Sequence, residues 1–188
     1  MPFNAAIQPG PKAFDFDINQ FTINKKRARA VDFSSPYYTA VQAVVTTGTS
    51  PAASATSLAD LKPLRIGAQV ATTSLDAVNE VIAPDGGAAV FNTNDDAKLA
   101  LENGQVDAIV VDLPTAFFIT SAELTDGKIV GQLAETGTGG DQFGLLLDKD
   151  SPLTECVSMA VDALTEDGTL AALEQEWLAD VAEAPVLE

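Results

Sequence analysis

Residues 64–111 are LRIGAQVATTSLDAVNEVIAPDGGAAVFNTNDDAKLALENGQVDAIVV, and this stretch decides the fold class. Short apolar runs alternate in it with amphipathic segments of helical length. The pattern predicts strands at 64–68, 88–91 and 106–111, a helix at 73–82 capped by Thr73 with Asp76, and a helix that Asn94 caps and Gly104 ends. Strands that alternate with helices in this way form parallel sheets from βαβ units, so we expect an α/β protein.

The flanking segments extend this pattern in both directions. Alternation at 14–18 predicts a half-buried strand, and β-branched and aromatic residues at 37–47 predict a long one. We expect a helix start at Ser57, followed three residues later by Asp60. The remaining expected elements are a short basic helix at 24–30, strands at 128–133 and 143–147, and two terminal helices with apolar faces, separated by Gly168.

Composition excludes several classes of function. The chain has 27 acidic and 10 basic residues, and a net charge of −17 repels nucleic acids and anionic lipids. It has no histidine, so the common general base, the Ser-His and Cys-His pairs and the usual zinc ligand are missing. We predict no catalytic residue, metal site or cofactor. The one cysteine, Cys156, lies in an apolar helical face, where we expect a small buried residue.

Three sites could bind a small charged molecule, although each has a structural alternative. Thr72 and Thr73 begin a helix after a strand, where they could bind a carboxylate or simply cap the helix. Asp112 ends a buried strand, where it could hold an ammonium group or cap the next helix. Arg27 could grip a carboxylate through two hydrogen bonds or lie on a solvated helix face. The glycine-rich residues 136–140 lack a phosphate-binding ending, and we expect a flexible connector there.

The order of these segments resembles the extracytoplasmic solute-binding proteins of polar amino-acid ABC transporters (bacterial solute-binding protein family 3). The most specific part is DFDINQFTINKKR at 15–27, followed by VDFSSPYY at 31–38. Further matches are the LK and IG pairs at 61–67 with TTS at 72–74, GQVDA at 104–108 with Asp112, and DGTL at 167–170 with Trp177. The similarity extends from Phe14 to the end of the chain.

This resemblance implies a site for one free, polar amino acid between two lobes. The α-carboxylate of the ligand would bind Arg27, with help from Thr22 and Thr73, and Thr72 would also belong to the ligand-binding residues. Asp112 would bind the α-ammonium group. Asn19, Gln20 and Gln69 fall where the family contacts the ligand side chain. The family has a glycine where this chain has Ala71, which could change how closely the ligand approaches the backbone.

The resemblance also implies a type II periplasmic-binding-protein fold with open, mainly parallel sheets and an incomplete first lobe. Family members begin with a strand, a helix and a strand that this chain lacks, and with them an aromatic residue that covers the ligand, so we expect an N-terminal truncation. Residues 1–42 would be the remnant of lobe 1 with the first hinge strand. Residues 43–140 would form lobe 2, and residues 141–188 would return to lobe 1 through the second hinge strand and the terminal helices.

The same resemblance implies the partners and the location. The partner would be a transporter permease. The protein would act outside the cytoplasm, as a periplasmic protein or as a lipoprotein at the cell surface, although this chain shows no signal sequence. An exposed strand edge of the incomplete lobe would favour self-association. Two other functions stay open. They are a periplasmic dehydratase acting on cyclohexadienyl acids and the ligand-binding module of a sensory receptor. The sequence does not decide which amino acid binds.

Overall fold

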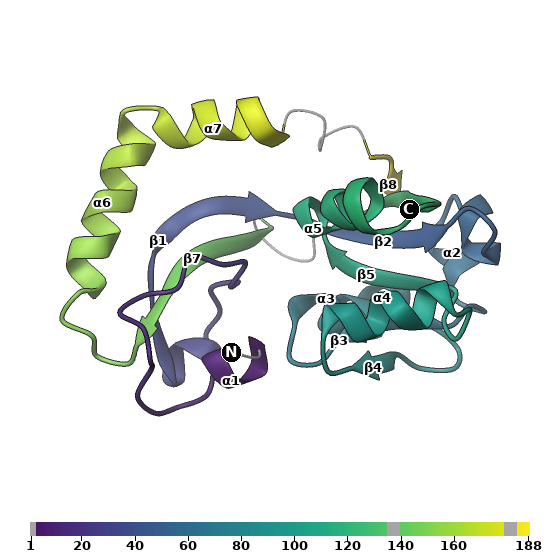
Figure 1. Cartoon of the computed structure of the whole chain (residues 1–188), viewed down its shortest axis with the longest axis horizontal. Coiled ribbons are helices and arrows are strands. Elements are labelled where there is room, and N and C mark those ends of the chain that lie inside the picture. Colours follow the sequence, from purple (N-terminus) through teal and green to yellow (C-terminus); the bar gives the residue numbers. More distant parts are fainter. Residues whose placement is uncertain (1–2, 135–139, 179–183) are drawn as a thin grey trace. The chain divides into compact units, whose positions relative to one another are not determined.

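The computed structural model of the chain describes residues 3–134, 140–178 and 184–188. The chain forms two compact units. Unit 1 comprises Met1–Ala40 and Gly139–Asp180, and unit 2 comprises Val41–Thr138 and Val181–Glu188. The polypeptide therefore passes from one unit to the other three times (Figure 1).

Unit 2 is built on a six-stranded sheet with the strand order β4-β3-β5-β2-β6-β8. Strand β3 is parallel to β4 and β5, β8 is parallel to β6, and β2 is antiparallel to both of its neighbours. Its elements are β2 (Gln42–Thr47), η2 (Pro51–Ser54), α2 (Leu58–Leu61), β3 (Ile66–Gln69), α3 (Thr73–Ala77), η3 (Val78–Ile82), β4 (Ala89–Phe91), α4 (Asn94–Glu102), β5 (Ala108–Asp112), α5 (Leu113–Phe118), η4 (Ile119–Glu123), β6 (Gly127–Leu133) and β8 (Val186–Leu187).

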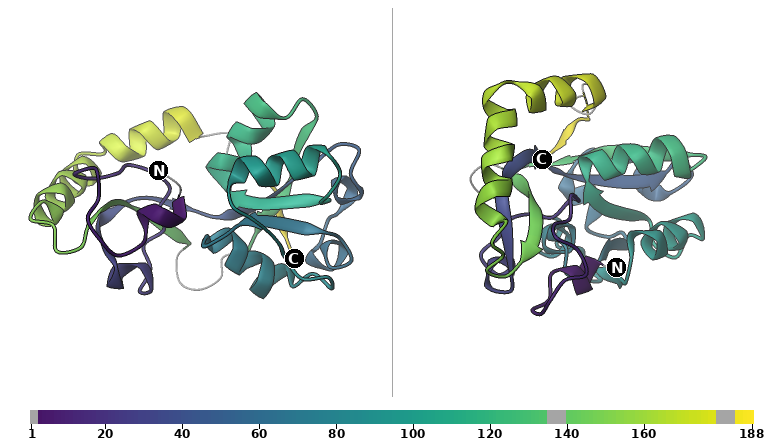
Figure 2. Two further views of the ribbon diagram at one scale, coloured as in Figure 1. Left: turned by 60° about the horizontal axis from the view of Figure 1, so that its bottom comes forward. Right: turned by 60° about the vertical axis from the view of Figure 1, so that its left-hand side comes forward.

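Both faces of this sheet are buried, as the continuous apolar run in β5 predicts. Ala108 and Val110 belong to a core with side chains from α2, α3 and η3. Ile109 and Val111 alternate with them and are buried as well, on the side where α4 and α5 pack against β5. The left-hand view of Figure 2 shows helices above and below the strands of unit 2. The predicted α/β class is therefore confirmed.

The helix starts of unit 2 match the predicted positions, with two corrections to their caps. Ser57 and Asp60 form the expected capping box. Helix α3 is capped by Thr72 rather than by Thr73, and α4 by Thr93 rather than by Asn94. In both cases the threonine one position earlier keeps an extended backbone, so its hydroxyl can accept from the N–H group three residues later.

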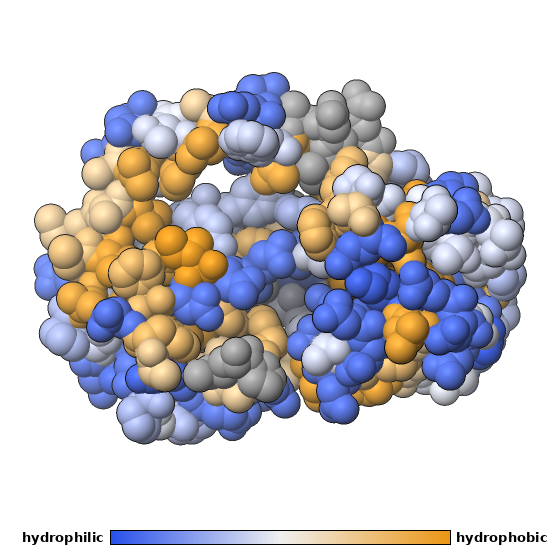
Figure 3. Space-filling model, viewed as in Figure 1, coloured by the Kyte–Doolittle hydropathy of each residue, from blue (hydrophilic) through white to orange (hydrophobic). Residues whose placement is uncertain are grey.

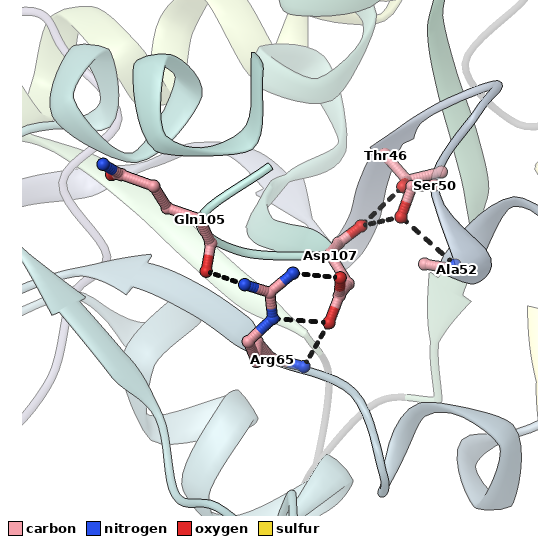
Figure 4. A network of polar contacts seen from close by, with 6 residues as sticks. All are labelled: Thr46, Ser50, Ala52, Arg65, Gln105 and Asp107. Carbon is pink, nitrogen blue, oxygen red and sulfur yellow. Dashed lines mark hydrogen bonds and ion pairs between the residues drawn. The ribbon is translucent and has the colours of Figure 1, made fainter. Parts of the chain in front are cut away.

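A polar network locks the strands at the end of the sheet where β3 and β5 begin (Figure 4). The guanidinium of Arg65 pairs with both carboxylate oxygens of Asp107, at 2.7 and 3.1 Å, and the backbone N–H of Arg65 donates to the same carboxylate at 2.8 Å. The carbonyl of Asp107 accepts from the hydroxyls of Thr46 and Ser50 at 2.7 and 2.6 Å. The hydrogen bonds from Arg65 hold the pKa of Asp107 below its usual value.

Unit 1 contains a two-stranded antiparallel sheet, β1 with β7, with α6 packed against β1. Its elements are α1 (Phe3–Ala6), η1 (Arg27–Arg29), β1 (Val31–Ala40), β7 (Asp141–Asp148), α6 (Thr154–Glu166) and α7 (Thr169–Leu178). A small core around Phe21, Val31 and Leu146 joins the N-terminal segment to the sheet. The pairing here is antiparallel, whereas the prediction of mainly parallel strands holds for three of the five strand pairs of unit 2.

Three local predictions for the N-terminal part are wrong. Residues 14–18 form no strand: Asp17 makes only a single bridge to Leu146. The chain then turns at Asn19, whose backbone carbonyl accepts from Phe21 N–H, so the pairing does not continue. The basic helix at 24–30 is one turn of 3₁₀ helix. The long strand at 37–47 is two strands in different sheets, interrupted at Val41, whose carbonyl accepts from Leu113 N–H.

The two terminal helices occur as predicted, but their apolar faces are exposed. In α6 only Val161 is buried, and Cys156 is exposed, which corrects the expectation of a buried thiol. Met159 is 65% and Trp177 73% exposed, because no described segment covers these faces. In Figure 3 apolar residues gather on the unit 1 part of the visible face, whereas the unit 2 part is mostly hydrophilic.

The end of the chain does not stay with the first lobe. We expected residues 141–188 to return there, but 181–188 belong to unit 2. The reason is strand pairing: β8 aligns parallel to β6, and Leu187 is buried in the unit 2 core. Residues 136–139 of the predicted glycine-rich connector lie outside the described residues.

Candidate functional site

Four of the predicted binding residues lie in unit 2, at one end of its sheet. Gln69 is the last residue of β3 and is buried, and Thr72 and Thr73 follow it. The hydroxyl of Thr72 donates to the carbonyl of Gln69 at 2.7 Å and accepts from Leu75 N–H at 3.1 Å. Thr72 therefore holds the turn together. Thr73, one residue later, is the first residue of α3.

Asp112 ends the neighbouring strand β5 and caps α5. Its carboxylate accepts from the backbone N–H of Thr115 at 3.1 Å and from the Thr115 hydroxyl at 3.0 Å. These two hydrogen bonds orient the carboxylate, and an ionised carboxylate has about four acceptor positions, so it can also accept from an ammonium group. The structure thus confirms the capping role that was one alternative for Asp112, and this role is compatible with binding.

The turn between β3 and α3 depends on an unusual backbone conformation. Ala71 has a φ of 63°, in the left-handed region that glycine adopts without steric cost. The resemblance predicts a glycine at this position. The methyl group of Ala71 imposes a local strain on the loop that carries Thr72 and Thr73.

The other four predicted residues lie in unit 1: Asn19, Gln20 and Thr22 precede η1, and Arg27 is the first residue of η1. Arg27 is 6% exposed, so the alternative of a solvated helix face is wrong for this residue. Its Nη1 donates to the carbonyl of Thr22 at 2.8 Å, and its guanidinium lies 5.2 Å from the centre of the Phe3 ring. The Phe3 ring stacks on Phe21, with ring centres 4.9 Å apart. A cation is thus held between a carbonyl and an aromatic face.

The segment that carries Asn19, Gln20 and Thr22 is held against β7 by backbone hydrogen bonds. Thr22 bridges Phe143, and Ile23 N–H donates to the carbonyl of Gln142 at 2.8 Å. The side-chain Oδ1 of Asn19 accepts from Gln20 N–H at 2.8 Å, and the backbone carbonyl of Asn19 accepts from the hydroxyl of Tyr37 at 2.7 Å. Asn19 is exposed and Gln20 half-buried, so both side chains of this loop are accessible.

The predicted residues therefore form two clusters, one in each unit, and sequence reasoning missed a member of each. Phe3 supplies an aromatic ring at Arg27 in unit 1. Gln42 donates to the hydroxyl of Thr73 in unit 2. The sequence offers only weak signals for these two residues. Phe3 is an apolar residue near the N-terminus and Gln42 is a polar residue at the start of an apolar strand, and neither feature is specific to a binding site.

Two further properties concern the described residues alone. Among them, no group of three or more histidine, cysteine, aspartate or glutamate side chains is arranged to hold a metal ion. The helices in the described part of the chain include none with the length and apolar character that crossing a membrane requires.

Comparison with known proteins identifies the family. The family described as "Bacterial extracellular solute-binding proteins, family 3" matches residues 1–180, so the chain belongs to it. The L-cystine-binding protein TcyJ of Escherichia coli (strain K12) is 31% identical over 90% of this chain, and the L-arginine-binding protein of Pseudomonas aeruginosa is 28% identical over 88%. The chain spans 62% and 65% of these two relatives.

A solved structure supports the same assignment at the level of the fold. An ancestral arginine-binding protein bound to glutamine superposes with a TM-score of 0.76 and 32% identity, over 95% of this chain and 77% of that chain. The likeness confirms the type II periplasmic-binding-protein fold.

Proposed function

We propose that this member of the solute-binding protein family captures one free, polar amino acid for an ABC transporter, with one cluster of residues in each unit contacting the ligand. The observation that carries the proposal is the buried guanidinium of Arg27, held by the Thr22 carbonyl and the Phe3 ring. A guanidinium binds a carboxylate through two parallel hydrogen bonds, and burial strengthens them. The α-carboxylate of an amino acid is such a group.

The cluster in unit 2 offers complementary contacts. The hydroxyl of Thr73 can donate to the ligand carboxylate, and the carboxylate of Asp112, oriented by Thr115, can accept from its α-ammonium group. Thr72 supports this cluster by holding the turn. A ligand that binds both clusters favours the arrangement of the units in which both reach it, so binding shifts a conformational equilibrium that a permease can recognise.

The side chain of the ligand would contact amides. Asn19, Gln20 and Gln69 can each donate and accept, which suits a polar side chain better than an apolar one. The names of the relatives specify cystine and arginine, and the solved neighbour holds glutamine. We therefore expect a ligand from this polar range.

Calorimetric titration of cystine, arginine and glutamine tests the proposal directly. We expect saturable 1:1 binding of at least one of them, and Arg27→Met should weaken it by about 100-fold or more, because two charge-assisted hydrogen bonds are lost. Arg27→Lys should show an intermediate loss, since lysine keeps the charge but cannot form the paired contact. Arg29→Met, in the same turn but exposed, is the matched control. Absence of heat for every amino acid tested would overturn the proposal.

The proposal extends to location and partners. As part of an uptake system the protein would act outside the cytoplasm, as a periplasmic protein or a lipoprotein, and its partner would be the transporter permease.

The exposed side chains of α6 and α7, such as Met159 and Trp177, also favour contact with a second copy. Light scattering at micromolar concentration tests this last point, and a monomer under those conditions would contradict it.

A further inference from the structure

Gln42 links the two groups that the proposed function assigns to unit 2. It is the first residue of β2, and its side-chain Nε2 donates to the hydroxyl of Thr73 at 3.3 Å. In the antiparallel ladder between β2 and β5 it stands directly opposite Asp112. Residues opposite each other in such a ladder project their side chains to the same face. Gln42 therefore neighbours both Thr73 and Asp112.

The direction of the hydrogen bond decides what Thr73 can do. A hydroxyl group has one proton to donate and two lone pairs that accept. Because the Gln42 amide nitrogen donates to this oxygen, it occupies one lone pair, and the proton of the Thr73 hydroxyl points away from the Gln42 amide nitrogen. A ligand carboxylate only accepts hydrogen bonds, so it needs the hydroxyl in this orientation.

The backbone around Gln42 is well placed to hold the amide in position. The preceding residue, Val41, accepts a hydrogen bond from Leu113 N–H at 2.9 Å, next to Asp112. The following residues, Ala43 to Val45, are fully buried in the sheet. Gln42 is half-buried itself and so starts from a rigid strand end, as a residue that orients a binding group must.

We infer that Gln42 is a positioning residue that orients the Thr73 hydroxyl to donate to the ligand carboxylate. This inference rests on the proposed function, because it supplies the ligand. Gln42 thereby becomes part of the site without contacting the ligand itself, because it acts through Thr73. This role also explains why a polar side chain begins the otherwise apolar strand β2.

A double-mutant cycle on ligand affinity tests the inference. The variants are Gln42→Met, Thr73→Val and the two combined, measured with the amino acid that binds the wild-type chain. Gln42→Met removes the donor at similar volume and should weaken binding about three- to tenfold, the range of one net hydrogen bond. With valine at position 73, the same change should cost less than about twofold, because the group that Gln42 orients is gone. Gln105→Met, on an exposed side chain of unit 2, controls for the general effect of the substitution.

Gln42→Glu tests the direction of the hydrogen bond. A carboxylate at this position accepts the proton of Thr73 and withdraws it from the ligand, so this variant should bind more weakly than Gln42→Met. The inference is overturned if Gln42→Met costs the same in both backgrounds, or if Gln42→Glu binds as well as Gln42→Met. Failure of the wild-type chain to bind any amino acid overturns the proposed function instead.

Discussion

The left-handed conformation of Ala71 places a steric cost next to the residues that we assign to binding. A non-glycine residue in this region costs about 1–2 kcal/mol relative to a right-handed conformation. The strained residue directly precedes Thr72, whose hydroxyl holds the turn through Gln69 and Leu75. Local strain of this kind persists only where surrounding contacts over-determine the backbone, and here those contacts belong to the candidate site.

Ala71→Gly should therefore increase the stability of unit 2. Relief of the left-handed strain exceeds the added entropy of the unfolded chain, for a net gain of about 0.5–1 kcal/mol. Urea unfolding measures the difference. Ala59→Gly, at an exposed position inside α2, is the matched control and should lose about 0.5–1 kcal/mol. A loss of stability in Ala71→Gly would show that the methyl group is needed for packing.

The pair of Asp107 and Arg65 is the second feature at the scale of single residues. The Asp107 side chain is 11% exposed, whereas the Arg65 side chain is 57% exposed, so only the carboxylate of the ion pair is shielded from water. The hydrogen bonds that the guanidinium of Arg65 and then its backbone N–H donate to the carboxylate lower the pKa of Asp107.

Asp107→Asn should destabilise unit 2 in a pH-dependent way. Because the folded pKa lies below the unfolded value of about 3.9, the carboxylate contributes stability above that value and loses it as the pH falls through the folded pKa. At pH 7 we expect a loss of about 1–3 kcal/mol relative to the wild type. The difference in urea unfolding should shrink as the pH is lowered to 3 and below. An equal difference at every pH would exclude the ionised carboxylate as its source.

At the scale of elements, the short strand β8 fastens the end of the chain to unit 2. Gln132 N–H donates to the carbonyl of Pro185 at 2.8 Å, and the Gln132 side chain donates to the carbonyl of Ala184 at 2.6 Å. At its end, the carbonyl of Glu188 accepts from Leu58 N–H at 3.0 Å. These contacts orient β8 so that Leu187 fills the core below β6 and Val186 points outward.

Leu187→Ala should accordingly cost about 2–4 kcal/mol of unit 2 stability, through lost burial and the cavity that remains. Leu187 is 1% exposed and Val186 is 52% exposed, so Val186→Ala provides a control in the same strand with an expected change within about 0.5 kcal/mol. The midpoint of urea unfolding measures both. Equal effects of the two changes would contradict the assigned pairing of β8.

At the scale of the whole molecule, the large net charge affects stability. The net charge of −17 comes from 27 acidic and 10 basic residues, and such an excess opposes compact structure through self-repulsion. Exposed ion pairs such as Lys149 with Asp32 at 2.7 Å contribute little each, so each offsets only a small part of this repulsion.

Salt should therefore stabilise this protein. Raising the ionic strength from 0.01 to 0.15 M shortens the screening length from about 30 to about 8 Å, which weakens long-range repulsion more than the close ion pairs. We expect the thermal midpoint to rise between these two conditions, with potassium chloride and sodium chloride acting alike. A midpoint that falls with salt would mean that the ion pairs contribute more than the repulsion removes.

Local signals in the sequence determined the alternating strands and helices of unit 2 and the capping box at Ser57, and they predicted the candidate binding residues of both clusters. Such signals are short-range, because periodicity, caps and a motif such as DFDINQFTINKKR lie within a few residues of each other. Only the tertiary structure decided which strand pairs with which. It divided residues 37–47 between two sheets, reduced 14–18 to one bridge, sent the chain end to β6 and left Cys156 exposed. The contacts of Arg27 with Phe3 and of Gln42 with Thr73 join residues 24 and 31 positions apart, which no local pattern specifies.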